Sequence, residues 1–132
     1  MGVKIFTSKL LREQLAEAEL QDLVVKFRNY KDQGATGDFF GRDTFYDRPP
    51  SVVAAGLWHV HTADAKSGPF KLRYAQFSRT SNTALVYCTG YFKPDHILLI
   101  GILYKAHEQY RDKPYSWYVP LVAIAEDFRS KF

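Results

Sequence analysis

The spacing of apolar side chains at the start of the chain predicts one short strand and one long helix. Val3, Ile5 and Thr7 occupy alternate positions, which is the two-residue period of a strand. Gly34 stands where a helix C-cap is expected, at the end of a helical pattern over residues 17–33. That pattern is one apolar stripe of Leu20, Leu23, Val24, Phe27 and Tyr30. A short helical turn is expected before it, around Leu10, Leu11 and Leu15.

Four further stretches have the length and composition of strands. They cover residues 57–62, 71–78, 84–91 and 97–104. Turn-forming residues separate the last three stretches, at 81–82 and 93–95, which favours a meander of antiparallel neighbours. The last stretch is apolar without alternation, so we expect it to be a central strand that is covered on both faces.

The remaining segments predict two long loops and one final helix. Residues 34–56 and 105–119 show little periodicity and are expected to be loops. The final helix is expected to begin near Pro120, which suits a first helical turn. The sequence therefore predicts a single α+β domain over residues 1–132, in which an N-terminal and a C-terminal helix pack a small antiparallel sheet.

The charge distribution suggests a polyanionic partner. The chain has 132 residues and a net charge of +4, and all of that excess lies after residue 66. No carboxylate occurs between Asp64 and Asp95, whereas five cations do: Lys66, Lys71, Arg73, Arg79 and Lys93. Such a patch suits the phosphates of a nucleic acid, although a solvated basic surface without a partner would show the same composition.

Other whole-chain features restrict the location and the chemistry. Cys88 is the single cysteine, so no internal disulfide is possible and a reduced cytoplasmic setting is expected. The first residues lack a signal-peptide pattern, and the apolar run at 97–104 is far shorter than a membrane span, so we expect no membrane partner. No phosphate-binding or dinucleotide-binding glycine motif occurs, and no cofactor is expected.

Two histidines form the first candidate site. His59 and His61 are two positions apart on a predicted strand, so both project from one face. Zinc would need a third ligand, and no recognisable spacing supplies one, so no metal site is expected. Two alternatives stay open for this pair: a structural role on the sheet surface, and a metal-dependent hydrolase in which Asp64 completes the ligands.

Basic and aromatic residues later in the chain form further candidates. Arg79, with Arg73 at the same strand parity, is placed to clamp a phosphate, and Lys71 belongs to the same basic stretch. The segment after the last strand combines a proton-transfer group, a stacking surface and cations: His107, Tyr110, Arg111 and Lys105. In the first long loop, Arg42 is expected to form an internal salt bridge with Asp43 or Asp47.

Six blocks of sequence together resemble the YafO-type toxins of bacterial toxin–antitoxin pairs. They occur in the same order over nearly the whole chain, at residues 40–47, 59–61, 76–82, 85–90, 98–103 and 125–132. The wider resemblance is to RelE-like toxins, which implies helices packed against a small antiparallel sheet. The polar positions that match the family pattern are His59, His61, Arg79, His107, Arg111 and Asp112.

This resemblance implies a ribosome-dependent mRNA interferase that a cognate antitoxin neutralises. Such enzymes act without metal and use the 2′-hydroxyl as the nucleophile. A histidine, His107 or one of the His59/His61 pair, would remove its proton, and Arg79 and Arg111 would stabilise the phosphorane. The expected partners are the antitoxin, the ribosome and mRNA, with operator DNA bound only through the antitoxin; a homodimer is left open. The alternative is a non-catalytic toxin that blocks translation by binding RNA or the ribosome.

Overall fold

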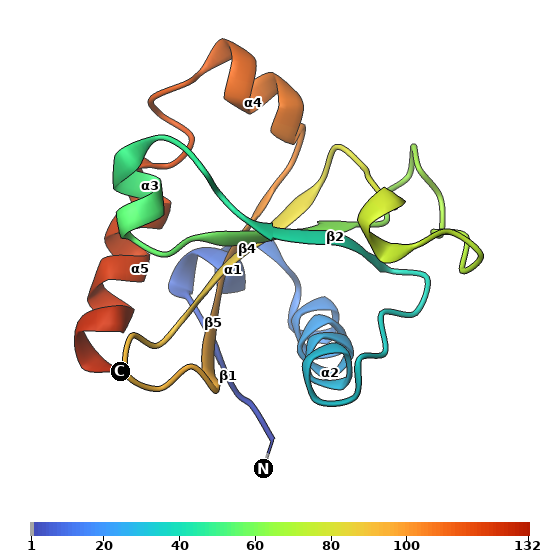
Figure 1. Ribbon diagram of the computed structural model, residues 1–132, viewed down its shortest axis with the longest axis horizontal. Helices are drawn as coiled ribbons and strands as arrows, with labels where there is room; N and C mark the ends of the chain where they lie inside the picture. The colour runs from blue at the N-terminus through green and yellow to red at the C-terminus, as the bar shows by residue number, and fades with distance from the viewer. Residues whose placement is uncertain (1) are drawn as a thin grey trace.

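The N-terminal elements follow the hydrophobic pattern and are fixed by local caps. The computed structural model describes residues 2–132 and begins with β1 (Lys4–Thr7), α1 (Lys9–Gln14) and α2 (Glu17–Gln33) (Figure 1). Ser8 caps α1, because its hydroxyl accepts a hydrogen bond from the Leu11 N–H at 3.0 Å. Gly34 ends α2 in the left-handed conformation, with φ at 69°. The strand, the short helical turn and the long helix predicted here are confirmed.

One five-stranded sheet forms the centre of the molecule. It comprises β1 with β2 (Phe40–Phe45), β3 (Trp58–Thr62), β4 (Ala84–Thr89) and β5 (His96–Leu103), in the order β1-β5-β4-β3-β2. Strands β2 to β5 form an antiparallel meander. The predicted meander is confirmed only for β3, β4 and β5, because β2 lies in a segment predicted to be a loop and the stretch 71–78 is not a strand. However, β1 pairs with β5 in parallel, so the sheet is mixed and the purely antiparallel prediction is wrong in this detail.

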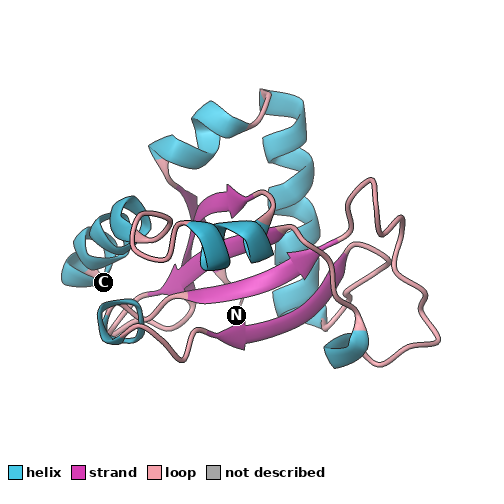
Figure 2. Ribbon diagram, turned by 90° about the horizontal axis from the view of Figure 1, so that it is seen from above, coloured by secondary structure: helices cyan, strands magenta, loops and turns pink. Residues whose placement is uncertain are grey.

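Strand β5 divides the core into two parts. On one side, Leu98 and Ile100 pack with α5 (Val119–Lys131), and on the other side Ile97 and Leu99 pack with α2. Figure 1 shows α5 and α2 on opposite sides of the sheet. In Figure 2, which is the view from above, the strands lie in the middle of the molecule with helices around them. The prediction of a strand covered on both faces is confirmed, and so is the final helix.

The strand predicted at 71–78 is wrong. This segment is irregular and ends in a single 3-10 turn, η1 (Gln76–Ser78). Leu72 and Tyr74, two large apolar residues of this segment, are exposed. Carbonyl groups of the segment bind the Arg79 side chain instead of a neighbouring strand, and its N–H groups find few backbone partners. The side chain of Arg79, five and seven residues further along the chain, therefore binds these carbonyl groups in place of a neighbouring strand.

Both predicted long loops contain regular structure. The first holds β2 and α3 (Pro50–Ala54), and the second holds α4 (Ala106–Asp112). Each of these elements is short, and the register of β2 is irregular between Phe40 and Asp43. The hydrophobic pattern of each one is therefore too short to predict a helix or a strand. None of the helices described over residues 2–132 has the length and apolar character needed to cross a membrane.

Candidate active site

Three of the four histidines line one cavity beside strand β3. It has a volume of about 340 Å³ and lies between β2, β3 and α4. Its lining consists of Arg42, His59, His61, Thr80, Ala84, Ala106, His107 and Tyr110. The structure thus brings together the histidine pair of β3 and the histidine of α4, which are far apart in the sequence.

His61 is held by the main chain of Ser81. Its Nδ1 atom lies 2.9 Å from both the Ser81 nitrogen and the Ser81 carbonyl oxygen. The ring can therefore accept a hydrogen bond from the N–H or donate one to the carbonyl, depending on its tautomer. Burial lowers the pKa of His61 below its usual value of 6.5, so the ring is neutral at physiological pH.

His59 lies deeper and is also neutral. Its ring stacks on Tyr46 with the centroids 4.0 Å apart, and lies 5.9 Å from the His61 ring. Burial, followed by the nearby His61, lowers the pKa of His59 to about 4. Its Nδ1 atom is buried and has no hydrogen-bond partner among the described residues. A buried polar atom without a partner is costly, and a role in catalysis or binding is one of the recognised reasons for keeping one.

Arg42 supplies a cation to this cavity from an irregular part of β2. Gly41 precedes it where the backbone passes so close to Arg79 that an added Cβ would lie 2.2 Å from the Arg79 carbonyl oxygen. The Arg42 N–H donates to that oxygen at 2.8 Å. Its guanidinium donates through Nε to the Phe77 carbonyl at 2.7 Å and lies 4.0 Å above the Phe77 ring.

The salt bridge predicted for Arg42 is wrong. Asp43 is the partner of Lys31, with a separation of 2.9 Å, and Asp47 is the partner of Arg48, at 3.1 Å. Successive strand residues point to opposite faces, so Asp43 faces α2 while Arg42 faces the histidines. Within residues 2–132, no carboxylate pairs with Arg42, which leaves its charge available to an anion.

The helix α4 that carries His107 is anchored by Asn82. The Asn82 carboxamide oxygen accepts from the His107 N–H at 2.7 Å, and its nitrogen donates to Glu108 at 2.6 Å. The Ala106 N–H donates to the Asn82 carbonyl at 2.8 Å. Lys105, which precedes the helix, has a φ of 50° and is the only non-glycine residue with positive φ among those described. His107 itself is exposed at the mouth of the cavity.

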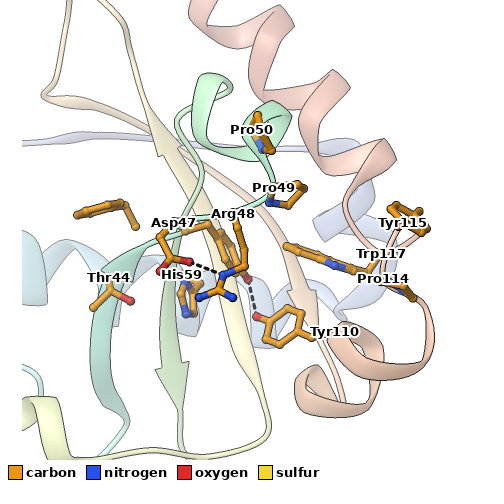
Figure 3. A pocket seen from close by; sticks show the side chains of 12 residues that line it. Thr44, Asp47, Arg48, Pro49, Pro50, His59, Tyr110, Pro114, Tyr115 and Trp117 are labelled. Atoms are coloured by element: carbon orange, nitrogen blue, oxygen red, sulfur yellow. Dashed lines mark hydrogen bonds and ion pairs between the residues drawn. The ribbon is translucent and has the colours of Figure 1, made fainter.

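Tyr110 connects this cavity to a larger one. Its hydroxyl lies 2.6 Å from the Tyr46 hydroxyl, and burial raises the pKa of both groups. The second cavity has a volume of about 770 Å³ and shares His59 and Tyr110 with the first (Figure 3). Tyr110 is therefore a common wall of two cavities.

Comparison with known proteins identifies the family of this chain. The model of the family described as "Toxin YafO, type II toxin-antitoxin system" matches residues 28–130, which include every residue of the histidine cavity. The chain belongs to the YafO toxin family. It is also 38% identical over 135 residues to the mRNA interferase toxin YafO of Escherichia coli (strain K12), across 98% of this chain and 100% of that protein. No solved structure matches.

In this YafO-family toxin, Arg79 lies outside the cavity and is nearly buried. Its guanidinium donates to the Tyr74 and Leu72 carbonyls at 3.0 and 3.2 Å. It also donates to the Thr36 hydroxyl at 2.8 Å and to the Gly37 carbonyl at 3.2 Å. Arg79 therefore joins two loops, and its own carbonyl positions Arg42.

The other predicted cations lie on the surface of the YafO-family toxin. Arg111 is exposed and binds the neighbouring Asp112 through two nitrogens, at 2.8 and 3.3 Å. Lys71, Arg73 and Lys105 are exposed and do not line the histidine cavity. Of the residues predicted to act on RNA, the structure groups only His59, His61, His107 and Tyr110.

The metal-dependent alternative lacks a ligand set. Asp64, its proposed third ligand, accepts hydrogen bonds from the Ser67 N–H at 2.8 Å and the Thr83 hydroxyl at 2.9 Å. No group of three or more His, Cys, Asp and Glu side chains over residues 2–132 is arranged to hold a metal ion.

Sequence reasoning missed the place of two residues at this candidate site, Arg42 in the cavity lining and Asn82 as the anchor of α4. A glycine inside a strand often marks a bulge that redirects the next side chain, so Gly41 is the signal that points to Arg42. Asn82 gives no comparable signal, because it anchors a helix that begins 24 positions later in the chain.

Proposed function

We propose that this chain is an mRNA interferase, the toxin of a type II toxin–antitoxin pair, and that the histidine cavity is its active site. The observation that carries the proposal is the grouping of three histidines and Arg42 around one cavity. Membership in the YafO toxin family and the name of the Escherichia coli relative support the activity.

In the proposed reaction, the 2′-oxygen of one nucleotide attacks the adjacent phosphorus of mRNA. His61 takes the 2′-hydroxyl proton, because its lowered pKa keeps the ring neutral. For this step the Ser81 carbonyl accepts the Nδ1–H, which leaves Nε2 as the base. The phosphorus–5′-oxygen bond then breaks, and His107 donates a proton to the leaving oxygen. The products are a 2′,3′-cyclic phosphate and a 5′-hydroxyl.

Arg42 takes the role of charge stabilisation in this proposal. Its guanidinium lines the cavity without a carboxylate partner in the described part of the chain. Preorganised cationic donors stabilise the additional charge of a phosphorane strongly. Arg79 has a positioning role, because its side chain joins the loops that hold Arg42. Lys71, Arg73, Lys105 and Arg111 are proposed to contact the RNA backbone outside the cavity.

The proposed setting is the bacterial cytoplasm. The small net charge of +4 gives this chain modest affinity for RNA by itself, so we propose that the ribosome holds and aligns the mRNA. A cognate antitoxin follows from membership in a type II toxin family, and operator DNA is proposed to be bound only through that antitoxin. The arrangement of helices and sheet is proposed to be RelE-like.

Primer extension on a defined mRNA tests this function. The full chain is added to a cell-free translation reaction, with and without ribosomes, and the new 3′ ends are analysed for a cyclic phosphate. Cuts that require ribosomes and carry a cyclic phosphate are expected. Arrested translation with uncut mRNA would instead make the protein a non-catalytic inhibitor that occupies RNA or the ribosome.

A further inference from the structure

The larger cavity is continuous with the proposed active site. His59 and Tyr110 form a wall common to both cavities. Figure 3 shows Pro114 and Trp117 along one side of the larger cavity and Asp47 and Arg48 along the other. Its volume of about 770 Å³ lies within the range typical of pockets for small ligands. A group attached to a substrate in the histidine cavity can therefore extend into it.

One wall of this larger cavity is a rigid aromatic surface. Trp117 packs against Tyr46 and Tyr110, with ring centroids 5.1 and 4.9 Å away, and Tyr46 in turn stacks on His59. Tyr115, in contrast, is 76% exposed and forms no aromatic pair within residues 2–132. The cavity thus combines a fixed aromatic wall with one free ring at its edge.

The charges of the larger cavity disfavour a phosphate. Asp47 and Arg48, the two charged residues of its lining, bind each other at 3.1 Å. The neighbouring histidine cavity holds Arg42, which has no such partner in the described chain. A phosphate is therefore favoured in the histidine cavity, and an uncharged planar ring in the larger one.

We infer that the larger cavity binds a nucleobase of the mRNA, next to the phosphate that is cleaved, with Tyr115 and Trp117 as stacking surfaces. This inference rests on the proposed function and adds to it the part of the substrate that fixes the position of the cut. Proteins bind single-stranded RNA by stacking its unpaired bases on aromatic side chains. Continuity with the histidine cavity favours RNA over a segment of the antitoxin as the occupant.

Binding of short 2′-O-methylated tetraribonucleotides to the full chain tests the inference, because these strands lack the attacking hydroxyl. A series in which each strand lacks one base should contain a position whose loss weakens binding about 5- to 150-fold, the equivalent of one stacked base. Tyr115→Ala should weaken binding of the intact strand by a similar factor. It should have little further effect on the strand that lacks the critical base, because both changes remove the same contact.

Two variants serve as controls. Tyr115→Phe keeps the ring and should bind as the wild type does. Tyr91→Ala removes another exposed tyrosine, which lies outside both cavities, and should also leave binding unchanged. Circular dichroism and thermal unfolding establish that each variant is folded.

The inference is overturned if Tyr115→Ala weakens the intact strand and all base-lacking strands equally, or leaves them unchanged. It is also overturned if the wild type binds none of the strands at millimolar concentration. A variant that binds RNA normally but escapes the antitoxin would make the cavity a protein-binding site. Failure of the proposed function would be distinguishable from failure of this inference. It would appear as uncut mRNA in the primer-extension test with the wild type, whereas the binding measurement uses strands that cannot be cleaved.

Discussion

The main chain of Ser81 offers both a donor and an acceptor to Nδ1 of His61. In the tautomer whose Nδ1–H donates to the Ser81 carbonyl, this contact fixes the ring and leaves Nε2 free to take up a proton and later release it. Burial lowers the pKa of the same ring, so that the neutral form required of a base is present at physiological pH. His61 is therefore the residue on which the proposed chemistry depends most.

The pH dependence of cleavage should reflect the lowered pKa of His61. A general base is inactive when protonated, so the rate falls as the pH drops through its pKa. Because burial places this pKa below 6.5 in the free protein, the acid limb of the second-order rate constant, measured with enzyme well below saturation, should have its midpoint below pH 6.5. A midpoint clearly above that value would exclude His61 as the base. The rate is measured on mRNA bound to purified ribosomes across the pH range.

The stability of the protein should fall at mildly acidic pH because of His59. Its pKa is about 4 in the folded chain and about 6.5 when unfolded, so between these values the unfolded state binds more protons. The free energy of unfolding should therefore decrease from pH 7 to pH 5, by on the order of 2 kcal/mol from this residue. Urea unfolding at both pH values should show a smaller decrease for His59→Phe than for the wild type. An unchanged decrease would contradict the assignment.

Individual residues were predicted from the sequence with uneven success. The pair His59 and His61 was correctly placed on one face, because strand periodicity determines the direction of a side chain. The roles of Arg42 and Arg79 depend on contacts between segments 37 positions apart, which no local pattern contains. The sequence therefore identifies the candidate side chains, and the three-dimensional fold determines which of them lie close together.

Among the elements, α4 depends on Asn82 for its position. The Asn82 side chain binds the first turn of the helix, where His107 lies, and its main chain binds Ala106. Asn82→Ala should therefore slow cleavage, because His107 loses its fixed position. The cost in unfolding free energy should be only about 1 kcal/mol, as for the loss of a helix cap.

Hydrogen exchange and single-turnover kinetics check the Asn82 prediction together. Faster exchange should be confined to α4 in Asn82→Ala. Asn29→Ala, on the exposed side of α2, is the matched control and should change neither measurement. Normal cleavage by Asn82→Ala with a loosened α4 would show that a fixed position of His107 is not required.

A buried polar network joins α2 to the sheet near the histidine cavity. The Asp43 carboxylate accepts from the Tyr30 and Tyr87 hydroxyls at 2.5 and 2.6 Å and from the Lys31 ammonium at 2.9 Å. Asp43→Ala leaves these partners without an acceptor and should lower the free energy of unfolding by about 3 kcal/mol. Asp47→Ala, which removes an exposed carboxylate from the same segment, should change stability little. Chemical denaturation measures both, and equal effects would contradict this account.

Elements with long hydrophobic periods were predicted correctly, and short or irregular ones were not. The helix α2 and the strand β5 bury continuous apolar surfaces, so their patterns are strong. The strand β2 is bent by an irregular register, and α4 is held by a distant side chain. These two elements carry Arg42 and His107. The elements that complete the proposed site are therefore those that the hydrophobic pattern did not predict.

For the whole molecule, the predicted α+β class and the two-sided core agree with the structure, and the parallel pairing of β1 with β5 was not predictable from local patterns. The basic stretch proved to be a surface loop rather than a strand, with Arg79 as its internal anchor. The histidine cavity is lined by residues of β2, β3, β4 and α4, together with Thr80. The proposed active site therefore forms only when the whole domain is folded.

The most direct test of the account compares the single-turnover cleavage rates of His61→Ala and His107→Ala with the wild type on ribosome-bound mRNA. His96→Asn changes the histidine outside the cavity and is the matched control. Loss of a general base or acid should slow cleavage about 100-fold or more in the first two variants, with little change in the control. Wild-type rates in both His61→Ala and His107→Ala would contradict the claim that the histidine cavity is the active site.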